Sequence, residues 1–210
     1  MLPPTLPLFP LPNVVLFPGV YLPLHVFEPR YRAMTREVLD GDRIVGMTLL
    51  KPGFEEQYEG RPPIFPIGCA GVVTHAERLE DGRFNIVLQG VERFRVLDED
   101  HSREFRVGTV EGLGGAEAAA SELVAVRTLR DRLERVLVPL VERAGAELNI
   151  PPSMSDADLI HALAQYLDLE PLEKQALLEC DSLLARGSAL ADLLEMKAMT
   201  GGLSTPSSKH

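Results

Sequence analysis

Apolar residues alternate with prolines through residues 6–32, a pattern that neither a helix nor a central strand tolerates. Proline lacks the N–H that a strand ladder needs and holds φ near one value, so each extended segment here must be short. We expect Pro18-Gly19 to turn one segment into the next. A helix is predicted over 28–39, with Pro29 near its start because proline suits the first helical position.

Runs of alternating apolar residues then predict a β-rich stretch. The expected strands lie at 43–50, 65–79, 84–89, 91–96 and 105–110. Asp81-Gly82 marks a hairpin, and Gly90 is expected to break the strand that follows it. The segment 51–63 is rich in Gly, Pro and Glu and is predicted to be a long loop. Several short strands with one early helix favour a small coiled sheet or partial barrel.

A spacing of three and four residues between apolar positions replaces this alternation in the second half of the chain, and it predicts helices. The apolar face of the first of them comprises Leu123, Val126, Leu129, Leu133, Val136 and Leu140. Pro139 is expected to kink or end that helix. Ser155 is predicted to cap a second helix, and Pro171 to begin a third. With a last helix from Ser182 to about Met199, this half is predicted to be a helical bundle.

The change of period predicts two domains and a tail. Residues 1–112 form the expected β-rich domain, and residues 113–200 the expected helical domain. The small, polar residues at 201–210 are expected to be disordered. The predicted fold class is therefore α+β.

The composition of the 210 residues narrows the function. There are 21 basic and 31 acidic residues, and the net charge of -10 argues against nucleic-acid binding, which depends on Lys and Arg at phosphates. Cys69 and Cys180 stand far apart and predict neither a disulfide framework nor a zinc site. No apolar run reaches membrane-spanning length. We therefore expect a cytoplasmic protein that does not associate with membranes.

Patterns that carry catalysis are missing from the sequence. The phosphate-binding sequence G-x-x-x-x-G-K-[ST] of P-loop ATPases does not occur, nor does a candidate Ser–Lys catalytic pair. His25 and Glu28 are close enough in sequence to share a metal or a proton, but no second ligand pair accompanies them. Structural hydrogen bonds are therefore the preferred interpretation of this pair. We expect no enzymatic activity, no cofactor and no metal site.

The opening segment also contains a specific series of short sequences. They are Pro-Leu-Phe-Pro-Leu at 7–11, Val-Leu-Phe-Pro-Gly at 15–19 and Leu-Pro-Leu-His-Val-Phe-Glu-Pro-Arg-Tyr-Arg at 22–32, with further matches at 67–69, 79–86, 90–96 and 173–179. Together they resemble the N-terminal substrate-binding domain of Lon-type ATP-dependent proteases, and in particular stand-alone proteins that carry this domain without the ATPase and peptidase. The resemblance implies a PUA-like pseudo-β-barrel for the β-rich domain.

The resemblance further implies a non-catalytic protein that binds unfolded or exposed hydrophobic polypeptide segments, as an adaptor or a holdase-like factor. The implied partners are unfolded or misfolded polypeptides and a separate ATP-dependent protease. An alternative is a small-molecule or RNA-binding PUA-like module. The aromatic content of only 6% weakens the RNA alternative, because single-strand binders stack bases on aromatic rings.

The residues expected to contact a polypeptide surround the start of the first predicted helix, with one aromatic residue in the loop at 51–63. They are His25, Phe27, Glu28, Arg30, Tyr31 and Phe54. Proline-interrupted strands leave main-chain groups unpaired, and an extended peptide can use these groups. Two interpretations of Arg30 stay open: recognition of a peptide or an acid, or a solvated helix surface paired with nearby glutamates.

Overall fold

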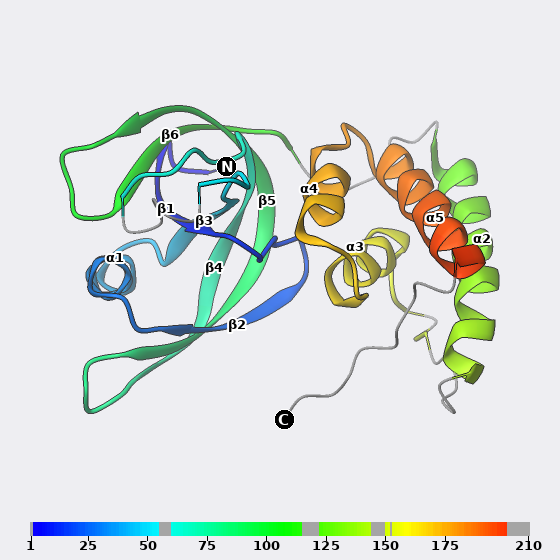
Figure 1. Ribbon diagram of the computed structural model, residues 1–210, viewed down its shortest axis with the longest axis horizontal. Coiled ribbons are helices and arrows are strands. Elements are labelled where there is room, and N and C mark those ends of the chain that lie inside the picture. Colours follow the sequence, from blue (N-terminus) through cyan, green and yellow to red (C-terminus); the bar gives the residue numbers. More distant parts are fainter. Residues whose placement is uncertain (1, 55–59, 115–121, 144–149, 152, 201–210) are drawn as a thin grey trace. The chain divides into compact units, whose positions relative to one another are not determined.

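The computed structural model describes residues 2–54, 60–114, 122–143, 150–151 and 153–200. The chain divides into two units, residues 1–115 and residues 116–210, which are described separately below. The tail predicted to be disordered, 201–210, lies outside the described residues. Within the described residues, a six-stranded sheet precedes four of the five helices, which confirms the α+β fold class (Figure 1).

A sheet that closes on itself forms the first unit. Its strands are β1 (Thr5–Leu11), β2 (Tyr21–Val26), β3 (Ile44–Leu49), β4 (Ile67–Arg78), β5 (Phe84–Asp100) and β6 (Arg106–Gly112). The strand order is β2-β5-β4-β3-β1-β6, and β5 also pairs with β6, so the ring closes and leaves β2 at an open edge. Strand β1 runs parallel to β3, whereas the other described pairings of the ring are antiparallel. Helix α1 (Pro29–Asp40) follows β2 and contacts β1.

The core of this unit depends on close packing around Phe94. Its ring is completely buried in a cluster with apolar side chains from several strands. Those buried neighbours are Leu6, Leu8, Leu50, Ile64, Ala70 and Val110. A Cβ added at Gly46 or Gly68 would lie 2.8 Å from the tip of the ring, so both glycines make room for it.

The prediction that Gly90 breaks a strand is wrong, because β5 continues through it from Phe84 to Asp100. Gly90 instead allows the turn after β1 to lie directly on the strand. Its N–H donates to the Val20 oxygen at 2.9 Å, and its oxygen accepts from the Gly19 N–H at 2.8 Å. A Cβ at Gly90 would overlap the main-chain oxygen of Phe17. The glycine therefore serves a close approach of two backbones, which is the other common reason for glycine inside a strand.

Replacing Gly90 by alanine should therefore destabilise the first unit by about 2 kcal/mol or more, because the added methyl forces the turn away from β5. The matched control is Gly41→Ala, where the nearest atom to an added Cβ is 3.5 Å away. Urea unfolding followed by tyrosine fluorescence measures both free energies of unfolding. Equal losses in the two variants would contradict the close approach at Gly90.

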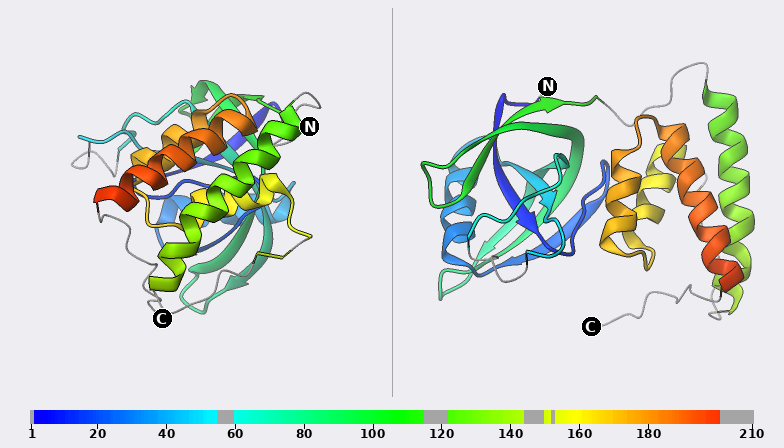
Figure 2. Two further views of the ribbon diagram at one scale, coloured as in Figure 1. Left: turned by 90° about the vertical axis from the view of Figure 1, so that its right-hand side faces the viewer. Right: turned by 45° about the horizontal axis from the view of Figure 1, so that its top comes forward.

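Four helices form the second unit. They are α2 (Leu123–Arg143), α3 (Asp156–Tyr166), α4 (Pro171–Glu179) and α5 (Leu183–Thr200). Figures 1 and 2 show α2 and α5 side by side. Ser155 caps α3 as predicted, since its hydroxyl accepts from the Asp158 N–H at 3.0 Å. Among the described residues, every helix is too short or too polar to cross a membrane.

Helix α2 differs from its prediction at Leu123. It continues through Pro139 to Arg143, so of the two effects predicted for the proline, the end of the helix does not occur. Leu123, predicted on the apolar face, is 56% exposed, whereas Leu133 is completely buried. Polar contacts add to the packing: Arg132 on α2 pairs with Glu195 on α5 at 2.6 Å and so lowers the pKa of that carboxyl.

A buried arginine ties three helices of the second unit together. Arg186 is 1% exposed and donates from Nε to the Leu177 oxygen at 2.9 Å and from Nη2 to the Cys180 oxygen at 3.1 Å. Its Nη1 lies 2.8 Å from Nε2 of His161 on α3. The guanidinium of Arg186 thus adds a donor to the Leu177 carbonyl, which also accepts from the Cys180 N–H, and to the Cys180 carbonyl just after α4.

Arg186→Leu should lower the free energy of unfolding of the helical unit by about 2–3 kcal/mol, because the substitution keeps apolar volume but removes the hydrogen bonds to Leu177 and Cys180 and the contact with His161. Arg127→Leu, at an exposed position on α2, is the control and should change it by less than about 0.5 kcal/mol. Far-UV circular dichroism during urea unfolding reports the loss of helix. A neutral Arg186→Leu would show that the hydrogen bonds to Leu177 and Cys180 do not stabilise the unit.

Candidate functional site

Strand β2 presents its open edge and one exposed face to solvent. It pairs with β5 along one side, and no other described strand pairs with it. Burial alternates along the strand: Val26 is buried, whereas Tyr21, Pro23 and His25 are exposed. This alternation follows from the pleat of a strand, which sends successive side chains to opposite faces.

The backbone of β2 is also unevenly paired. The Gly90 N–H donates to the Val20 oxygen, so by the alternation of an antiparallel ladder the main-chain groups of Pro23 and His25 turn to the open side. Because proline has no N–H to donate to a neighbouring strand, a strand tolerates it at an outward-facing edge position such as that of Pro23. The open side therefore carries the main-chain groups of Pro23 and His25.

Exposed rings follow the same edge. Phe27, directly after β2, is 60% exposed, and Tyr21 at the other end of the strand is 51% exposed. The His25 ring stacks on the Phe27 ring, with centroids 6.2 Å apart and planes inclined by 25°. We call Tyr21, His25 and Phe27 the aromatic row.

A ladder of polar side chains across β2, β5 and β4 orients His25. Its Nδ1 lies 2.8 Å from Oδ1 of Asn85, whose Nδ2 donates to Glu77 at 3.0 Å. Because Oδ1 only accepts, Nδ1 carries the proton, and Nε2 accepts from Arg83 Nη1 at 3.2 Å. His25 is thus an oriented ring within the aromatic row, and its described partners do not include Glu28.

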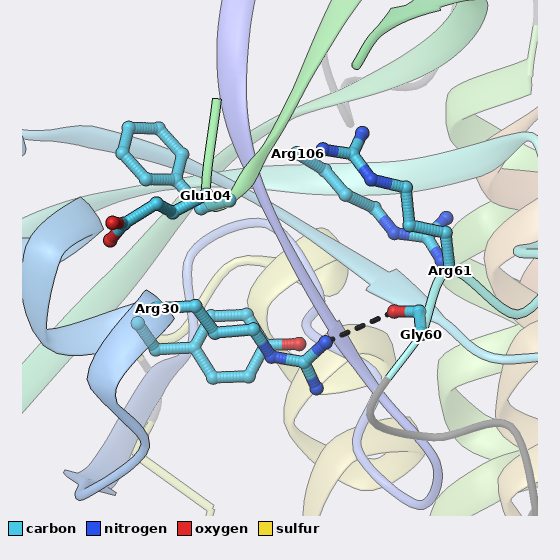
Figure 3. Close-up of a pocket in the computed structure, with 7 residues that line it drawn as sticks. Arg30, Gly60, Arg61, Glu104 and Arg106 are labelled. Atoms are coloured by element: carbon cyan, nitrogen blue, oxygen red, sulfur yellow. Dashed lines mark hydrogen bonds between the residues drawn. The ribbon is translucent and has the colours of Figure 1, made fainter. Parts of the chain in front are cut away.

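Glu28 and Arg30 lie at the start of α1, separate from the aromatic row; Figure 3 shows Arg30. Arg30 donates to Glu28 Oε2 from Nε at 3.0 Å and contacts it from Nη2 at 2.9 Å. Its Nη1 donates to the Gly60 oxygen at 3.1 Å, and its guanidinium lies 4.6 Å from the centre of the Tyr31 ring. Arg30, Tyr31 and Gly60 line a pocket of about 170 Å³, which we call the arginine pocket.

Tyr31 and Phe54 differ in how far they are exposed. Tyr31 is only 3% exposed; its ring packs 4.4 Å from that of Phe9, and its hydroxyl donates to the Pro10 oxygen at 3.3 Å. It belongs to the core and forms a wall of the arginine pocket. Phe54 is 36% exposed in the segment after β3 and does not line that pocket. Part of the predicted loop, 55–59, lies outside the described residues.

Sequence reasoning missed the other residues of the arginine pocket. They are Gly60, Arg61, Glu104, Phe105 and Arg106. The nearby turn is held by Asp100, which accepts from the Ser102 N–H at 2.8 Å, and this hydrogen bond lowers the pKa of Asp100. No local sequence signal identifies these residues, because only the closure of the sheet brings them to α1. Among the described residues, no three His, Cys, Asp or Glu side chains are grouped to hold a metal ion.

The separation of the predicted site residues into core and surface has a direct test. Tyr31→Ala should cost about 3–5 kcal/mol of unfolding free energy, because it removes a buried ring and leaves a cavity. Phe27→Ala should cost less than about 0.5 kcal/mol, because the ring is mostly exposed. Urea unfolding of both variants measures the difference. Similar losses in the two would mean that Phe27 is a packing residue.

Comparisons with known proteins agree with this architecture. Residues 5–196 match the family described as the ATP-dependent protease La (LON) substrate-binding domain. The chain is 28% identical over 200 residues to Lon protease 2 of Myxococcus xanthus, which covers 93% of this chain and 24% of that protein. It is 27% identical over 200 residues to the Lon protease of Anaeromyxobacter dehalogenans, with the same coverage of 93% and 24%.

Solved structures are similar over most of the chain. The Lon N-terminal domain protein from Xanthomonas campestris has a TM-score of 0.58 at 24% identity and covers 91% of this chain and 97% of its own. The N-terminal domain of the Mycobacterium avium complex Lon protease has a TM-score of 0.63 at 17% identity and covers 91% and 98%. At these identities the solved structures show the fold alone.

The match over residues 5–196 decides the family. It agrees with the short sequences at 7–11, 15–19 and 22–32, from which the resemblance was first inferred. This chain spans 24% of the length of the two curated relatives described above. It belongs to the family of Lon substrate-binding domains.

Proposed function

We propose that this chain is a non-catalytic module that binds unfolded polypeptides by their exposed hydrophobic segments. Membership of the family supports a substrate-binding role, and the match is to the substrate-binding domain rather than to a catalytic one. The observation that carries the proposal is the aromatic row on the open edge of β2. It supplies exposed apolar surface beside the outward-facing main-chain groups of Pro23 and His25, and an unfolded chain supplies apolar side chains and main-chain groups in return.

The proposed binding mode is addition of an extended segment to the edge of β2. Main-chain hydrogen bonds to Pro23 and His25 give affinity without sequence preference, and alternate side chains of the ligand contact the aromatic row. Burial of an exposed phenylalanine contributes about 1.5–3 kcal/mol, or roughly tenfold to a hundredfold in affinity. Such binding suits an adaptor that delivers clients to a separate ATP-dependent protease, or a holdase-like factor that keeps them from aggregating.

A titration with a fluorescent, permanently unfolded polypeptide tests the proposal. The wild-type protein should bind it saturably and should ignore a folded protein and single-stranded RNA. Phe27→Ser should weaken binding by about tenfold or more, because the variant removes the most exposed ring of the row. Tyr21→Ser should act in the same direction.

The matched control is Leu97→Ser, because Leu97 is 59% exposed on β5 and is not part of the aromatic row. This variant should bind as the wild type does. Equal weakening by Leu97→Ser and Phe27→Ser would move the binding surface away from β2. Absence of binding at high micromolar protein would refute the proposed function.

A further inference from the structure

Three arginines from separate segments converge on the arginine pocket. Arg30 comes from the first turn of α1, Arg61 from the segment before β4, and Arg106 from the first residue of β6. The Arg106 Nη2 donates to the Pro62 oxygen at 2.5 Å and so fixes that segment beside β6. Figure 3 shows the three guanidinium groups on one side of the pocket.

Two of the three charges are balanced by neighbouring carboxylates. Arg30 pairs with Glu28 at 2.9 Å, and Arg106 pairs with Glu99 at 3.1 Å. Glu104 also lines the pocket, but Figure 3 shows its carboxylate pointing away from the guanidinium groups. Carboxylates therefore balance the charges of Arg30 and Arg106. The charge of Arg61 has no carboxylate in contact among the described residues.

Arg61 has only neutral partners among the described residues. Its Nη atoms donate to the oxygens of Asp100, His101 and Arg103 at 3.2, 3.3 and 2.7 Å, and Nη1 lies 2.6 Å from the His101 Nδ1. These contacts orient the guanidinium without cancelling its charge. The pocket thus carries about one positive charge in excess of the acids that its arginines contact.

The helix end adds to the field of this charge. Arg30 and Tyr31 belong to the first turn of α1, where the helix dipole places its positive end. The side chains of Arg106 and Arg30 are 7% and 19% exposed, whereas Arg61 is exposed and its charge is screened by water. The helix end and the two less exposed arginines favour an anion in the pocket.

The walls and size of the pocket select the anion. Tyr31 and Phe105 supply apolar walls, and about 170 Å³ accommodates a small group rather than a whole peptide. A carboxylate is planar, matches the fork of a guanidinium and carries a single negative charge, equal to the excess in the pocket. A phosphate would bring more charge than the pocket leaves uncompensated.

We propose that the arginine pocket binds a carboxylate group of the polypeptide ligand, either its C-terminal carboxylate or an Asp or Glu side chain. That the carboxylate belongs to a polypeptide rests on the proposed function. The pocket itself lies on different residues from the aromatic row, so the two sites can be tested separately.

Binding of acetate tests the pocket without any peptide. Sodium acetate, titrated at constant ionic strength against sodium chloride, should shift the side-chain N–H resonances of Arg30 and Arg61 saturably in NMR spectra of the whole chain. Inorganic phosphate should bind more weakly than acetate. Tighter binding of phosphate, or no saturable shift with acetate, would overturn the proposal.

Three apolar peptides of one sequence then distinguish the source of the carboxylate. One has a free C-terminus, one is amidated, and one is amidated but ends in Glu. The free acid should bind about tenfold more tightly than the amide. If the Glu-ended amide recovers the tight binding, a side chain suffices as the source; if it binds as the plain amide does, the C-terminal carboxylate is the source.

Arg30→Gln and Arg61→Gln should each reduce the difference between free acid and amide to less than about threefold. Arg36→Gln, at an exposed position on α1, is the charge-matched control and should leave the difference unchanged. Arg61→Gln also removes the contacts to the turn at 100–103. If the Arg61→Gln variant fails to fold, the Arg30→Gln variant and the acetate titration test the proposal.

The outcomes separate the two proposals. If all three peptides bind equally and Phe27→Ser still weakens their binding, the pocket does not recognise a carboxylate and the proposed function stands. If no peptide binds while acetate binds at Arg30 and Arg61, the pocket is a carboxylate site and the proposed function fails.

Discussion

The pairing of β5 with β6 is the interaction on which the rest of the first unit depends. Strand β5 is long enough to pair with β2 in its first half and with β6 in its second, while β4 accompanies it over most of its length. Register shifts near Gly71 and Asp98 let these long strands bend, as bulges do, and the sheet closes around Phe94. Closure of the sheet therefore determines which strand edge stays outside the ring and which residues meet at its rim.

Both candidate sites follow from that closure. Strand β2 pairs with β5 but lies outside the closed ring, so it keeps an open edge, and the pleat exposes the rings of Tyr21 and His25 there. At the rim, β6 carries Arg106 to the start of α1, where Arg30 already lies. One surface is apolar and tolerant of sequence, while the other is small, charged and specific for a chemical group. An unfolded chain contains partners for both.

The sequence predicted elements better than it predicted approaches between them. Periodicity and proline placement located the strands, the start of α1 and the cap at Ser155, because these depend on neighbours in the chain. Gly90 was misread, since its reason is the Phe17 oxygen from a distant turn. In the same way, alternation gave no sign that Tyr31 is buried against Phe9, and nothing local connects Arg61 with Arg30. The family itself was recognisable from the segments at 7–11, 15–19 and 22–32.

The position of β1 has a consequence for the order in which the chain folds. Although it is made first, β1 pairs with β3 and with β6, the last strand of the unit. Its partners at Thr5–Leu8 are about a hundred residues away, so the N-terminal strand must wait, unpaired on one side, until β6 has been synthesised. Until then the nascent chain carries an incompletely covered apolar segment, Leu6 to Leu11.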